Sequence, residues 1–339
     1  MNEGIRARVV ITQRFIDDEV LAYLHSHGCD THVVDLPPGK GDADFTEAEL
    51  AGLLERADGW IVGHAHVTRA LLARLPQLQV VARRGVGYDR LDTAAVRELG
   101  KVATIAVGGN DAAVADHAVA LMLAVAHRLR EGQARLEAGG WSIPLGTDLY
   151  RKTVGIVGLG RIGRGVAARL KGFECRILAC TRAPDVATAP CDGVEVTTLQ
   201  QVLADSDFLT LHAPLTPETR FLLDRRSIAA MKRTAIVVNT ARGGLVNDWD
   251  LLHALQEGRL QGAGLDVFAS ESDPEFRAAT EQLVRLPNVV ASPHSGASTA
   301  EGLQRTNLIA ARSIVAVLQG GHPARECVIA DGRPLSTQP

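Results

Sequence analysis

Short apolar runs alternate with amphipathic stretches through the first third of the chain. The apolar runs are rich in β-branched residues and predict strands at Val9–Thr12, Thr31–Val34, Gly59–Val62 and Gln79–Ala82. The stretches between them have helical spacing and predict helices at Asp17–Gly28, Thr46–Arg56 and Thr68–Leu75. Thr46 and Glu49 have the spacing of a capping box, which marks a helix start. This βαβα alternation predicts a parallel sheet covered by helices.

A second alternating series begins near Lys152. It predicts six further strands, at Thr153–Val157, Arg176–Cys180, Phe208–His212, Ala235–Asn239, Gly262–Val267 and Val289–Ser292. Helical patterns between these strands include Gly163–Lys171, Leu199–Ala204 and Asp248–Glu257. Two longer patterns each predict one long helix, at Ala112–Gly140 and Thr299–Gln319, and the proline-bearing segment Trp141–Asp148 predicts a loop. We therefore expect an α/β protein with two doubly wound halves.

Length and charge narrow the class of protein further. At roughly 150 residues per domain, a chain of 339 residues corresponds to two domains. The 36 basic and 39 acidic residues leave no basic excess, which argues against binding to nucleic acid. The apolar stretch Ala118–Ala126 has half the length needed to cross a bilayer, and Met1–Arg8 lacks the apolar core of a secretory signal. Five cysteines without CxxC spacing argue against a zinc ribbon or a paired disulfide framework, so we expect a cytoplasmic protein without a membrane segment.

The strongest local motif is Gly158-Leu159-Gly160-Arg161-Ile162-Gly163, which follows a predicted strand and opens a predicted helix. This is the context of a dinucleotide-binding fingerprint. The first glycine makes a tight turn, the second lets the backbone approach a pyrophosphate, and the third lets helix and strand pack closely. The phosphate would lie at the helix N-terminus, where N–H groups and the helix dipole favour an anion. We therefore predict an NAD or NADP site.

The end of the next strand indicates which of the two cofactors is used. An acidic residue there would bind the 2′-hydroxyl of the adenosine ribose and repel a 2′-phosphate. The sequence has Thr181 and Arg182 instead, a hydroxyl and a guanidinium that suit a phosphate. In the alternative interpretation Arg182 is a solvated loop residue and Asp185 takes the acidic role. The residues favour NADP over NAD.

Four motifs occur in an order that resembles a known enzyme family. They are the segments Gly158–Gly163, Asn239–Gly244, Gly264–Phe268 and Ser292–Thr299. Together they resemble the D-isomer-specific 2-hydroxyacid dehydrogenases, with phosphoglycerate dehydrogenase among the closer members. The resemblance extends from about Val9 to Gly320, and no regulatory domain is expected after that point.

The resemblance implies a domain arrangement. A Rossmann NAD(P)-binding domain, residues 108–296, would be inserted into a flavodoxin-like substrate-binding (lid) domain made of residues 1–107 and 297–339. The active site would lie in the cleft between the domains. The long helix expected at Ala112–Gly140 would help to form a homodimer.

Three residues in or close to these motifs are candidates for catalysis. Reduction of a 2-keto acid needs a hydride from nicotinamide, a proton for the developing alkoxide and a cation for the carboxylate. His294 follows a predicted strand and is the candidate proton donor, because imidazole titrates near neutral pH. The resemblance implies that Glu271 pairs with this histidine and orients its ring. Arg242 offers a guanidinium fork that can bind the carboxylate and polarise the carbonyl.

The resemblance also implies cofactor contacts beyond the glycine motif. Asp266 would receive the nicotinamide carboxamide and orient the ring. The other candidates are His212, Pro214, Thr240, Ala241, Arg242, His294 and Gly296. For His212 itself, a packing role is favoured over a catalytic one.

The turn after the strand Gln79–Ala82 is the candidate substrate-binding segment. Its glycines leave backbone N–H groups that can form a nest for a carboxylate, as in the family's own carboxylate-binding turn. The substrate-binding candidates are His64, Arg84, Val86, Gly87, Arg242 and His294. The adjacent Arg83 and Arg84 suit a doubly anionic substrate; alternatively, strand alternation points one of them to solvent.

Several positions depart from the family pattern. Gly63 and His64 stand where relatives that act on phosphohydroxypyruvate carry Arg-Ser, which predicts the loss of a phosphate-binding arginine. His64 and His66 have no evident third ligand, so no metal is expected. Ser272 replaces the proline that usually follows the catalytic glutamate, and Asp116 replaces a glutamate.

The expected activity is that of an NAD(P)-dependent D-2-hydroxyacid dehydrogenase that acts on a small 2-keto or 2-hydroxy acid. Phosphoglycerate dehydrogenase and hydroxypyruvate or glyoxylate reductase are the favoured activities. Formate dehydrogenase is disfavoured, because those relatives pair the histidine with glutamine, and phosphite oxidation is disfavoured by Val86 at a lysine position. The alternative from another class is an NAD(H)-sensing, corepressor-like binding protein without turnover.

Overall fold

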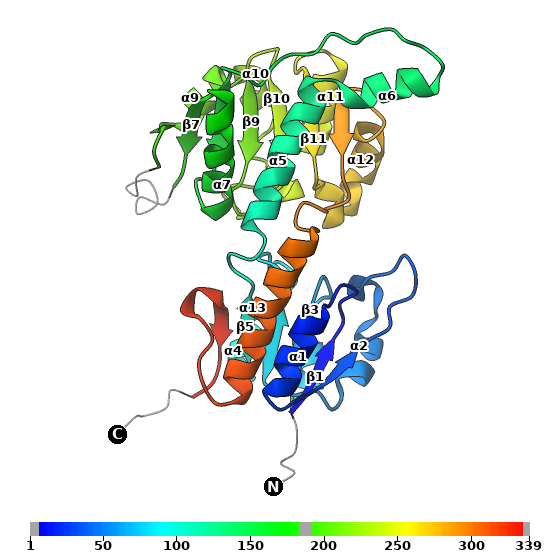
Figure 1. The fold of residues 1–339 in the computed structure, drawn as a ribbon, viewed down its shortest axis with the longest axis vertical. Coiled ribbons are helices and arrows are strands. Elements are labelled where there is room, and N and C mark those ends of the chain that lie inside the picture. Colours follow the sequence, from blue (N-terminus) through cyan, green and yellow to red (C-terminus); the bar gives the residue numbers. More distant parts are fainter. Residues whose placement is uncertain (1–6, 183–190, 335–339) are drawn as a thin grey trace. The chain divides into compact units, whose positions relative to one another are not determined.

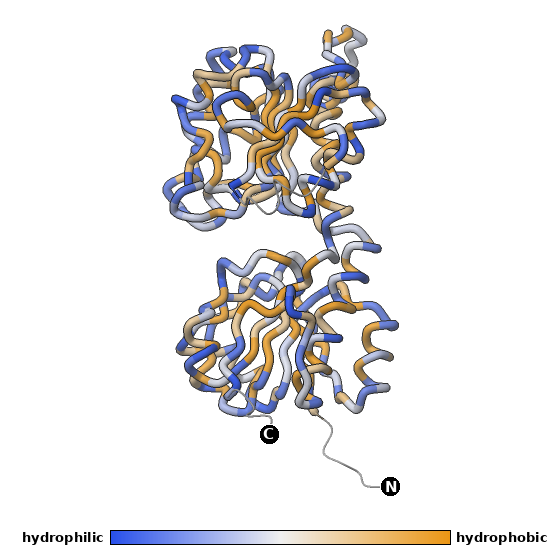
Figure 2. Tube along the Cα trace, turned by 90° about the vertical axis from the view of Figure 1, so that its left-hand side faces the viewer, coloured by the Kyte–Doolittle hydropathy of each residue, from blue (hydrophilic) through white to orange (hydrophobic). Residues whose placement is uncertain are grey.

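The computed structural model describes residues 7–182 and 191–334, which form two compact units (Figure 1). The first unit combines Met1–Asn110 with Thr299–Pro339, and the second is the continuous segment Asp111–Ser298. Each unit contains its own sheet. Figure 2 shows apolar strands in the middle of each unit and more polar segments around them.

The sheet of the first unit has six strands in the order β13-β5-β4-β3-β1-β2. They are β1 (Ala7–Ile11), β2 (Cys29–Val33), β3 (Gly59–Val62), β4 (Val80–Arg83), β5 (Val102–Ile105) and β13 (Val328–Asp331). The pairs are parallel except for β13, which pairs antiparallel with β5. The parallel strands follow the flavodoxin-like order 2-1-3-4-5, which reverses direction between β1 and β3. The expected flavodoxin-like architecture is confirmed, with an antiparallel edge strand that the sequence pattern did not predict.

Helices cover both faces of this first sheet. They are α1 (Asp18–Ser26), α2 (Glu47–Leu54), α3 (Arg69–Ala73), α4 (Thr93–Glu98) and α13 (Ala300–Leu318). Helices α1 and α13 cover Val9 and Val80 on one face. Helices α2, α3 and α4 cover Val10 and Val81 on the other face. Since successive strand residues are buried under different helices, the central strand β3 is apolar and buried along its whole length, whereas the edge strand β2 is polar and mostly exposed.

The sheet of the second unit has seven strands in the order β12-β11-β10-β9-β6-β7-β8. They are β6 (Thr153–Val157), β7 (Arg176–Cys180), β8 (Val194–Val196), β9 (Phe208–Leu211), β10 (Ile236–Asn239), β11 (Gly262–Leu265) and β12 (Val289–Ala291). Every pair is parallel. Counted from β6, this is the Rossmann order 3-2-1-4-5-6 with one further strand, and its direction reverses between β6 and β9. The Rossmann prediction is confirmed.

Helices also cover both faces of the second sheet. They are α5 (Asp111–Ala126), α6 (Leu129–Glu137), α7 (Arg161–Leu170), α9 (Leu199–Asp205), α10 (Arg225–Ala230), α11 (Asp248–Gln256) and α12 (Arg277–Leu283). Helices α5 and α7 lie side by side over Ile156 and Val238 (Figure 1). Helices α9 to α12 pack over Val157 and Val237 on the opposite face. Short 3₁₀ turns connect several elements, at Asp42–Asp44, Lys171–Phe173, Gly243–Leu245, Ala269–Glu271, Pro274–Phe276 and Arg325–Cys327.

The prediction of a single long helix at Ala112–Gly140 is wrong. The structure has two helices there, α5 and α6, bent by 58° with respect to each other. Arg128 adopts a left-handed conformation between them, with φ of 51°. The backbone N–H of Thr147 donates to the carbonyl of Ala126 at 2.9 Å, so the returning chain satisfies the end of α5. Among the described residues no single helix is long and apolar enough to span a membrane, and the bent α5–α6 pair meets that criterion by length and composition only.

Element ends follow local capping signals where the sequence contains them. The capping box at Thr46 and Glu49 is present and starts α2, as predicted. Asp17 caps α1 by accepting the backbone N–H of Val20 at 3.0 Å. The strand predicted at Thr31–Val34 begins earlier, at Cys29, directly after Gly28 with its positive φ of 80°. Helix α4 and strand β5 were not predicted.

Candidate active site

The glycine motif forms a tight strand–turn–helix connection between β6 and α7. Gly158 has a φ of 99°, and a Cβ there would lie 2.7 Å from backbone atoms of His212 and Ala213. A Cβ at Gly163 would lie 2.2 Å from the carbonyl oxygen of Gly158. Both glycines are therefore required for packing at the point where the strand order reverses, which is where open α/β sheets bind ligands.

The start of α7 is open. Gly160 is its N-cap, and no described side chain caps the helix there. A Cβ at Gly160 would meet none of the described atoms within 4 Å. Helix N-termini of this kind bind phosphate through the amides of the first turn, which here belongs to Arg161 and Ile162. This arrangement fits the pyrophosphate of a dinucleotide.

The end of β7 carries Thr181 and Arg182. The guanidinium of Arg182 is exposed, and its Nη2 donates to Oγ1 of Thr216 at 3.3 Å. Its Nη1 lies 3.7 Å from Oε2 of Glu218. The alternative residue, Asp185, lies outside the described residues. The guanidinium proposed for a 2′-phosphate therefore lies at this strand end, beside the acidic side chain of Glu218.

His212 follows β9 and supports the turn. Its Nε2 lies 2.9 Å from Oγ1 of Thr210. Burial lowers the pKa of His212 to about 4, so its ring is neutral at neutral pH. Within the described part of the chain, its Nδ1 is buried without a hydrogen-bond partner. The carbonyl of Pro214 accepts from Oγ1 of Thr219 at 2.7 Å, which fixes the next loop.

The turn after β10 carries Arg242. Asn239 is buried at the end of the strand, and its Nδ2 donates to the carbonyl of Arg242 at 2.9 Å while its Oδ1 accepts the N–H of Ala241 at 3.1 Å. The Nη1 of Arg242 donates to the carbonyl of Ala241 at 2.7 Å. Oγ1 of Thr240 is buried and, as far as the described residues go, has no hydrogen-bond partner. A buried hydroxyl of this kind fits a polar group of a bound cofactor.

Asp266 organises the loop after β12. It is buried at the end of β11, and its carboxylate accepts hydrogen bonds from Ser292 Oγ at 2.6 Å, Ser295 N at 2.8 Å and Gly296 N at 2.9 Å. Nε2 of His117 lies 3.4 Å from the same carboxylate. Burial alone would raise the pKa of Asp266, but these hydrogen bonds lower it to about 2. Asp266 therefore holds as an anion the loop that carries His294.

His294 and Glu271 are in direct contact. Nδ1 of His294 lies 2.6 Å from Oε2 of Glu271, and each side chain is 36% exposed. Oε1 of Glu271 accepts the backbone N–H of Phe268 at 2.9 Å. His294 has a positive φ of 52°, and its N–H donates to the carbonyl of Asp266 at 2.8 Å. The structure thus brings together the acid–histidine pair that the sequence predicted.

The carboxylate-binding candidates of the first unit follow β4. Nε of Arg83 donates to the carbonyl of Gly87 at 2.7 Å, and Gly85 between them has a φ of 145°. The backbone N–H of Arg84 donates to the carbonyl of Val62 at 2.9 Å. Burial lowers the pKa of Arg84, while the charge of Asp42 opposes that shift. Arg83 and Arg84 are both half-buried, and Nη1 of each is shielded from solvent. Val86 is half-buried in the same turn.

A buried carboxylate fixes the turn that contains His64. Asp42 accepts the backbone N–H groups of Gly63 at 2.6 Å and His64 at 2.7 Å, and also Nε2 of Gln13 at 2.9 Å. A Cβ at Gly63 would lie 1.7 Å from Nε2 of Gln13. Gln13 therefore occupies the space of a side chain at position 63. Within residues 7–182 and 191–334, no group of three or more His, Cys, Asp or Glu side chains could hold a metal ion.

Comparisons with known proteins place this geometry in a family. The model of the D-isomer specific 2-hydroxyacid dehydrogenase, NAD binding domain, matches residues 119–296. The chain belongs to the D-isomer specific 2-hydroxyacid dehydrogenase family. It is 38% identical to a glyoxylate reductase of Pyrococcus furiosus, over 76% of this chain and 78% of that protein.

Two further proteins are similar to this chain over most of its length. A D-3-phosphoglycerate dehydrogenase of Methanocaldococcus jannaschii is 38% identical over 81% of this chain but 52% of that protein, so the chain spans about half the length of this relative. The crystal structure of the TT0316 protein from Thermus thermophilus superposes with a TM-score of 0.83 and 36% identity. That alignment covers 95% of this chain and 100% of the other.

Sequence reasoning missed three residues around the acid–histidine pair of this family member. Ser292 directs its hydroxyl hydrogen to Asp266, so Nε2 of His117, 2.8 Å away, must donate to the serine oxygen. His117 lies on α5, where its spacing looks like that of any helical residue. Asp248 is buried at the start of α11 and accepts the backbone N–H of Ala269 at 3.0 Å. Ser292 lies within one of the four family motifs, whereas nothing in the sequence around His117 or Asp248 indicated a role in the site.

Proposed function

We propose that the chain is an NAD(P)-dependent D-2-hydroxyacid dehydrogenase that reduces a small 2-keto acid. The contact of 2.6 Å between His294 and Glu271 carries this proposal. The position of Arg242 supports the proposal. Arg242 follows β10, Glu271 follows β11 and His294 follows β12. Strand β11 pairs with both β10 and β12. The three candidate catalytic residues therefore follow three adjacent parallel strands at the same sheet edge.

The residues have complementary roles in this proposal. A bound nicotinamide supplies the hydride that adds to the carbonyl carbon of the keto acid. Arg242 binds the substrate carboxylate and polarises the carbonyl. With Nδ1 of His294 donating to Glu271, the proton transferred to the alkoxide oxygen is the one on Nε2. Asp266 holds the histidine loop and is our candidate acceptor for the nicotinamide carboxamide.

The dinucleotide is proposed to bind along the carboxyl edge of the second sheet. The open start of α7 would receive the pyrophosphate, and the buried hydroxyl of Thr240 would bind a polar group of the cofactor. Thr181 and Arg182 favour the 2′-phosphate of NADPH, although Glu218 competes for the guanidinium. In the test, Arg182→Ala raises the KM for NADPH about tenfold, as expected for loss of a charge-assisted contact, and leaves the KM for NADH unchanged. Equal effects on both cofactors would contradict a 2′-phosphate site.

An unphosphorylated substrate is favoured over a phosphorylated one. Arg84, Val86, Gly87 and His64 of the first unit are the proposed substrate contacts. Gln13 fills the space beside Gly63, and Asp42 already occupies the backbone N–H groups of the Gly63–His64 turn. At position 63 a phosphate would therefore find no side chain, and the backbone N–H groups of Gly63 and His64 are already bonded to Asp42. Hydroxypyruvate and glyoxylate are accordingly better candidates than phosphohydroxypyruvate.

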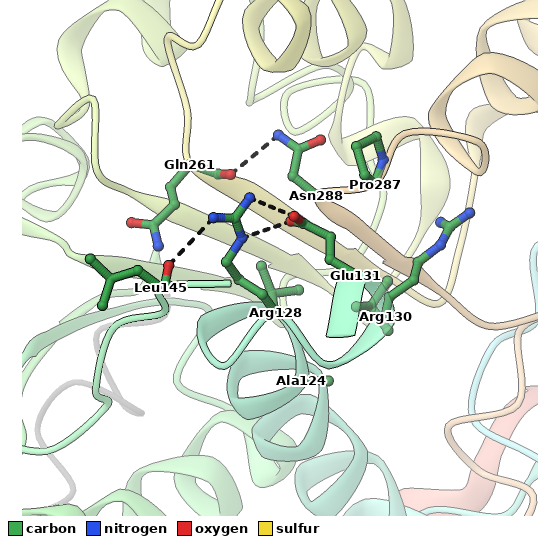
Figure 3. Close-up of a pocket in the computed structure, with 10 residues that line it drawn as sticks. Ala124, Arg128, Arg130, Glu131, Leu145, Gln261, Pro287 and Asn288 are labelled. Carbon is green, nitrogen blue, oxygen red and sulfur yellow. Dashed lines mark hydrogen bonds and ion pairs between the residues drawn. The ribbon is translucent and has the colours of Figure 1, made fainter. Parts of the chain in front are cut away.

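A homodimer is proposed to form through α6 and the segment that follows it. Trp141, Ile143 and Leu145 are 86%, 91% and 88% exposed, which is costly for large apolar side chains in a lone chain. Leu145 also lines a hollow of about 270 Å³, in which Arg128 pairs with Glu131 and Asn288 donates to Gln261 (Figure 3). We expect a dimer by analytical ultracentrifugation, and a monomer for the double variant Trp141→Asp/Ile143→Asp. A monomeric wild-type protein would overturn the proposed homodimer.

The main test is a panel of 2-keto acids, each offered with NADH and with NADPH. Cofactor absorbance should fall with glyoxylate, hydroxypyruvate or a related acid. His294→Ala and Arg242→Ala should each abolish most of this turnover. Tight cofactor binding without turnover of any acid would favour the NAD(H)-sensing alternative.

A further inference from the structure

Asp248 is a buried carboxylate that its own helix does not require. It is the first residue of α11 and is 2% exposed. The helix already has a cap, because Oδ1 of Asn247 accepts the backbone N–H groups of Trp249 at 3.1 Å and Asp250 at 3.3 Å. Burying a carboxylate is costly unless partners compensate for the lost hydration. The reason for burying Asp248 therefore lies in what it contacts outside α11.

Asp248 supports the 3₁₀ turn Ala269–Glu271, named here the carboxylate turn. Its Oδ2 accepts the backbone N–H of Ala269 at 3.0 Å and lies 3.5 Å from Oγ1 of Thr280 on α12. The same Thr280 hydroxyl lies 2.8 Å from Oγ of Ser270. The first two residues of the turn are thus supported by Asp248 and Thr280. The third residue is the glutamate that pairs with the candidate proton donor.

The position of the Glu271 carboxylate depends on this turn. Oε1 accepts the backbone N–H of Phe268, which directly precedes the turn, at 2.9 Å. Oε2 lies 2.6 Å from Nδ1 of His294. Both oxygens are therefore engaged. A shift of the turn would strain or break the contact with the histidine.

The carboxylate turn also lies against the segment that carries Arg242. A Cβ at Gly243, the next residue, would lie 2.0 Å from C and O of Phe268 and 2.5 Å from N of Ala269. From Gly243 the chain runs through a 3₁₀ turn into α11. We name residues 242–248 the Arg242 segment. It contacts the carboxylate turn twice, by the backbone at Gly243 and by the hydrogen bond that the N–H of Ala269 donates to Asp248.

We propose that Asp248 is a positioning residue that fixes the carboxylate turn against the Arg242 segment and thereby sets the spacing of guanidinium and imidazole. The proposal rests on the proposed function. Asp248 acts through Ala269 and not by touching reacting atoms. Its effect falls on kcat, because a misplacement of about 1 Å in a catalytic group can cost roughly 100-fold in rate. The charged group that influences Asp248 is Glu271, whereas the hydrogen-bond partners of Asp248 at Ala269 and Thr280 are neutral.

Substitutions at Asp248 separate positioning from folding. Asp248→Ala should lower kcat about 10- to 100-fold and change the KM values for keto acid and cofactor less than about threefold. Asp248→Asn keeps an acceptor for the N–H of Ala269 and should retain kcat within about threefold of wild type. The matched control is Asp250→Asn, two residues along α11, where the carboxylate accepts the backbone N–H of Arg225 and kcat should not change. A folded Asp248→Ala enzyme with wild-type kcat would overturn the proposal.

A second readout does not depend on turnover. In ¹⁵N spectra of labelled histidine, the Nδ1 signal of His294 should report its hydrogen bond to Glu271 in wild type, Asp248→Asn and Asp250→Asn. In Asp248→Ala it should move toward that of a solvated imidazole; an unchanged signal contradicts the proposal. If Asp248→Ala does not fold, Thr280→Val, which removes the support of Ser270, should shift the same signal in the same direction, and no shift would again contradict it. If wild type reduces no keto acid, the proposed function fails while the spectra still test the positioning role.

Discussion

Asp248 should make the stability of the second unit depend on pH. Burial raises its pKa from 3.8 to about 7; the Ala269 N–H and the Thr280 hydroxyl oppose this, and the Glu271 charge adds to it. Between about pH 4 and pH 7 the folded chain therefore keeps a proton that the unfolded chain has released. The stability contributed by this group is fully present below about pH 4 and is lost as pH rises through about 7.

The size of the effect follows from the shift. About three pKa units correspond to roughly 4 kcal/mol, at 1.36 kcal/mol per unit. Asp248→Asn cannot ionise, so the unfolding free energy of this variant relative to wild type should rise by roughly 3 kcal/mol between about pH 4.5 and pH 8, the part of the total that falls within that range.

Urea unfolding at several pH values measures this difference, and Trp249, the next residue, provides fluorescence from the same unit. Asp250→Asn serves as the control for a charge change on the same helix. A difference between Asp248→Asn and wild type that stays constant within about 1 kcal/mol across this range would refute the reasoning, since linkage requires it to change.

Three other substitutions test the site. His294→Gln should lower kcat about 10²- to 10⁴-fold, and a loss of less than about tenfold would contradict its role as proton donor. Gly243→Ala should destabilise the second unit by about 3 kcal/mol or more, because its Cβ would lie 2.0 Å from the Phe268 carbonyl; a melting temperature within about 2 °C of wild type would contradict this contact. Asp266→Asn should cost about 2 kcal/mol of stability at neutral pH, because hydrogen bonds lower the pKa of Asp266 to about 2. That difference should disappear as pH falls from about 4 through about 2, and a pH-independent loss in acid and urea titrations would argue against it.

The nucleotide-binding half was predictable because its signals are local. The glycine motif is set by contacts within a few residues, as the 2.2 Å approach of a Cβ at Gly163 to the Gly158 carbonyl illustrates. The pairing of Glu271 with His294 came from the family resemblance and agrees with the structure. Their distance in sequence would otherwise have concealed it.

The parts that were missed depend on distant partners. Strand β13 pairs with β5 across more than two hundred residues, and neither short run shows this pairing on its own. The break between α5 and α6 depends on Thr147, which reaches the carbonyl of Ala126 from beyond α6. Asp248 resembles an ordinary acidic residue in a first helical turn, a position that the helix dipole favours. Its role becomes visible only when Ala269 is seen beside it.

The contact between Gln13 and Gly63 limits which substitutions the first unit can accept during evolution. A single substitution that adds a side chain at position 63 would collide with the Gln13 amide, 1.7 Å from the first added atom. The Gln13 amide is itself held by Asp42, at 2.9 Å, and this carboxylate also accepts the backbone N–H groups of Gly63 and His64. Lineages that acquire a long residue at 63 should therefore carry a shorter one at 13, and the two positions should vary together among homologues. Engineering at this turn would likewise have to begin at residue 13.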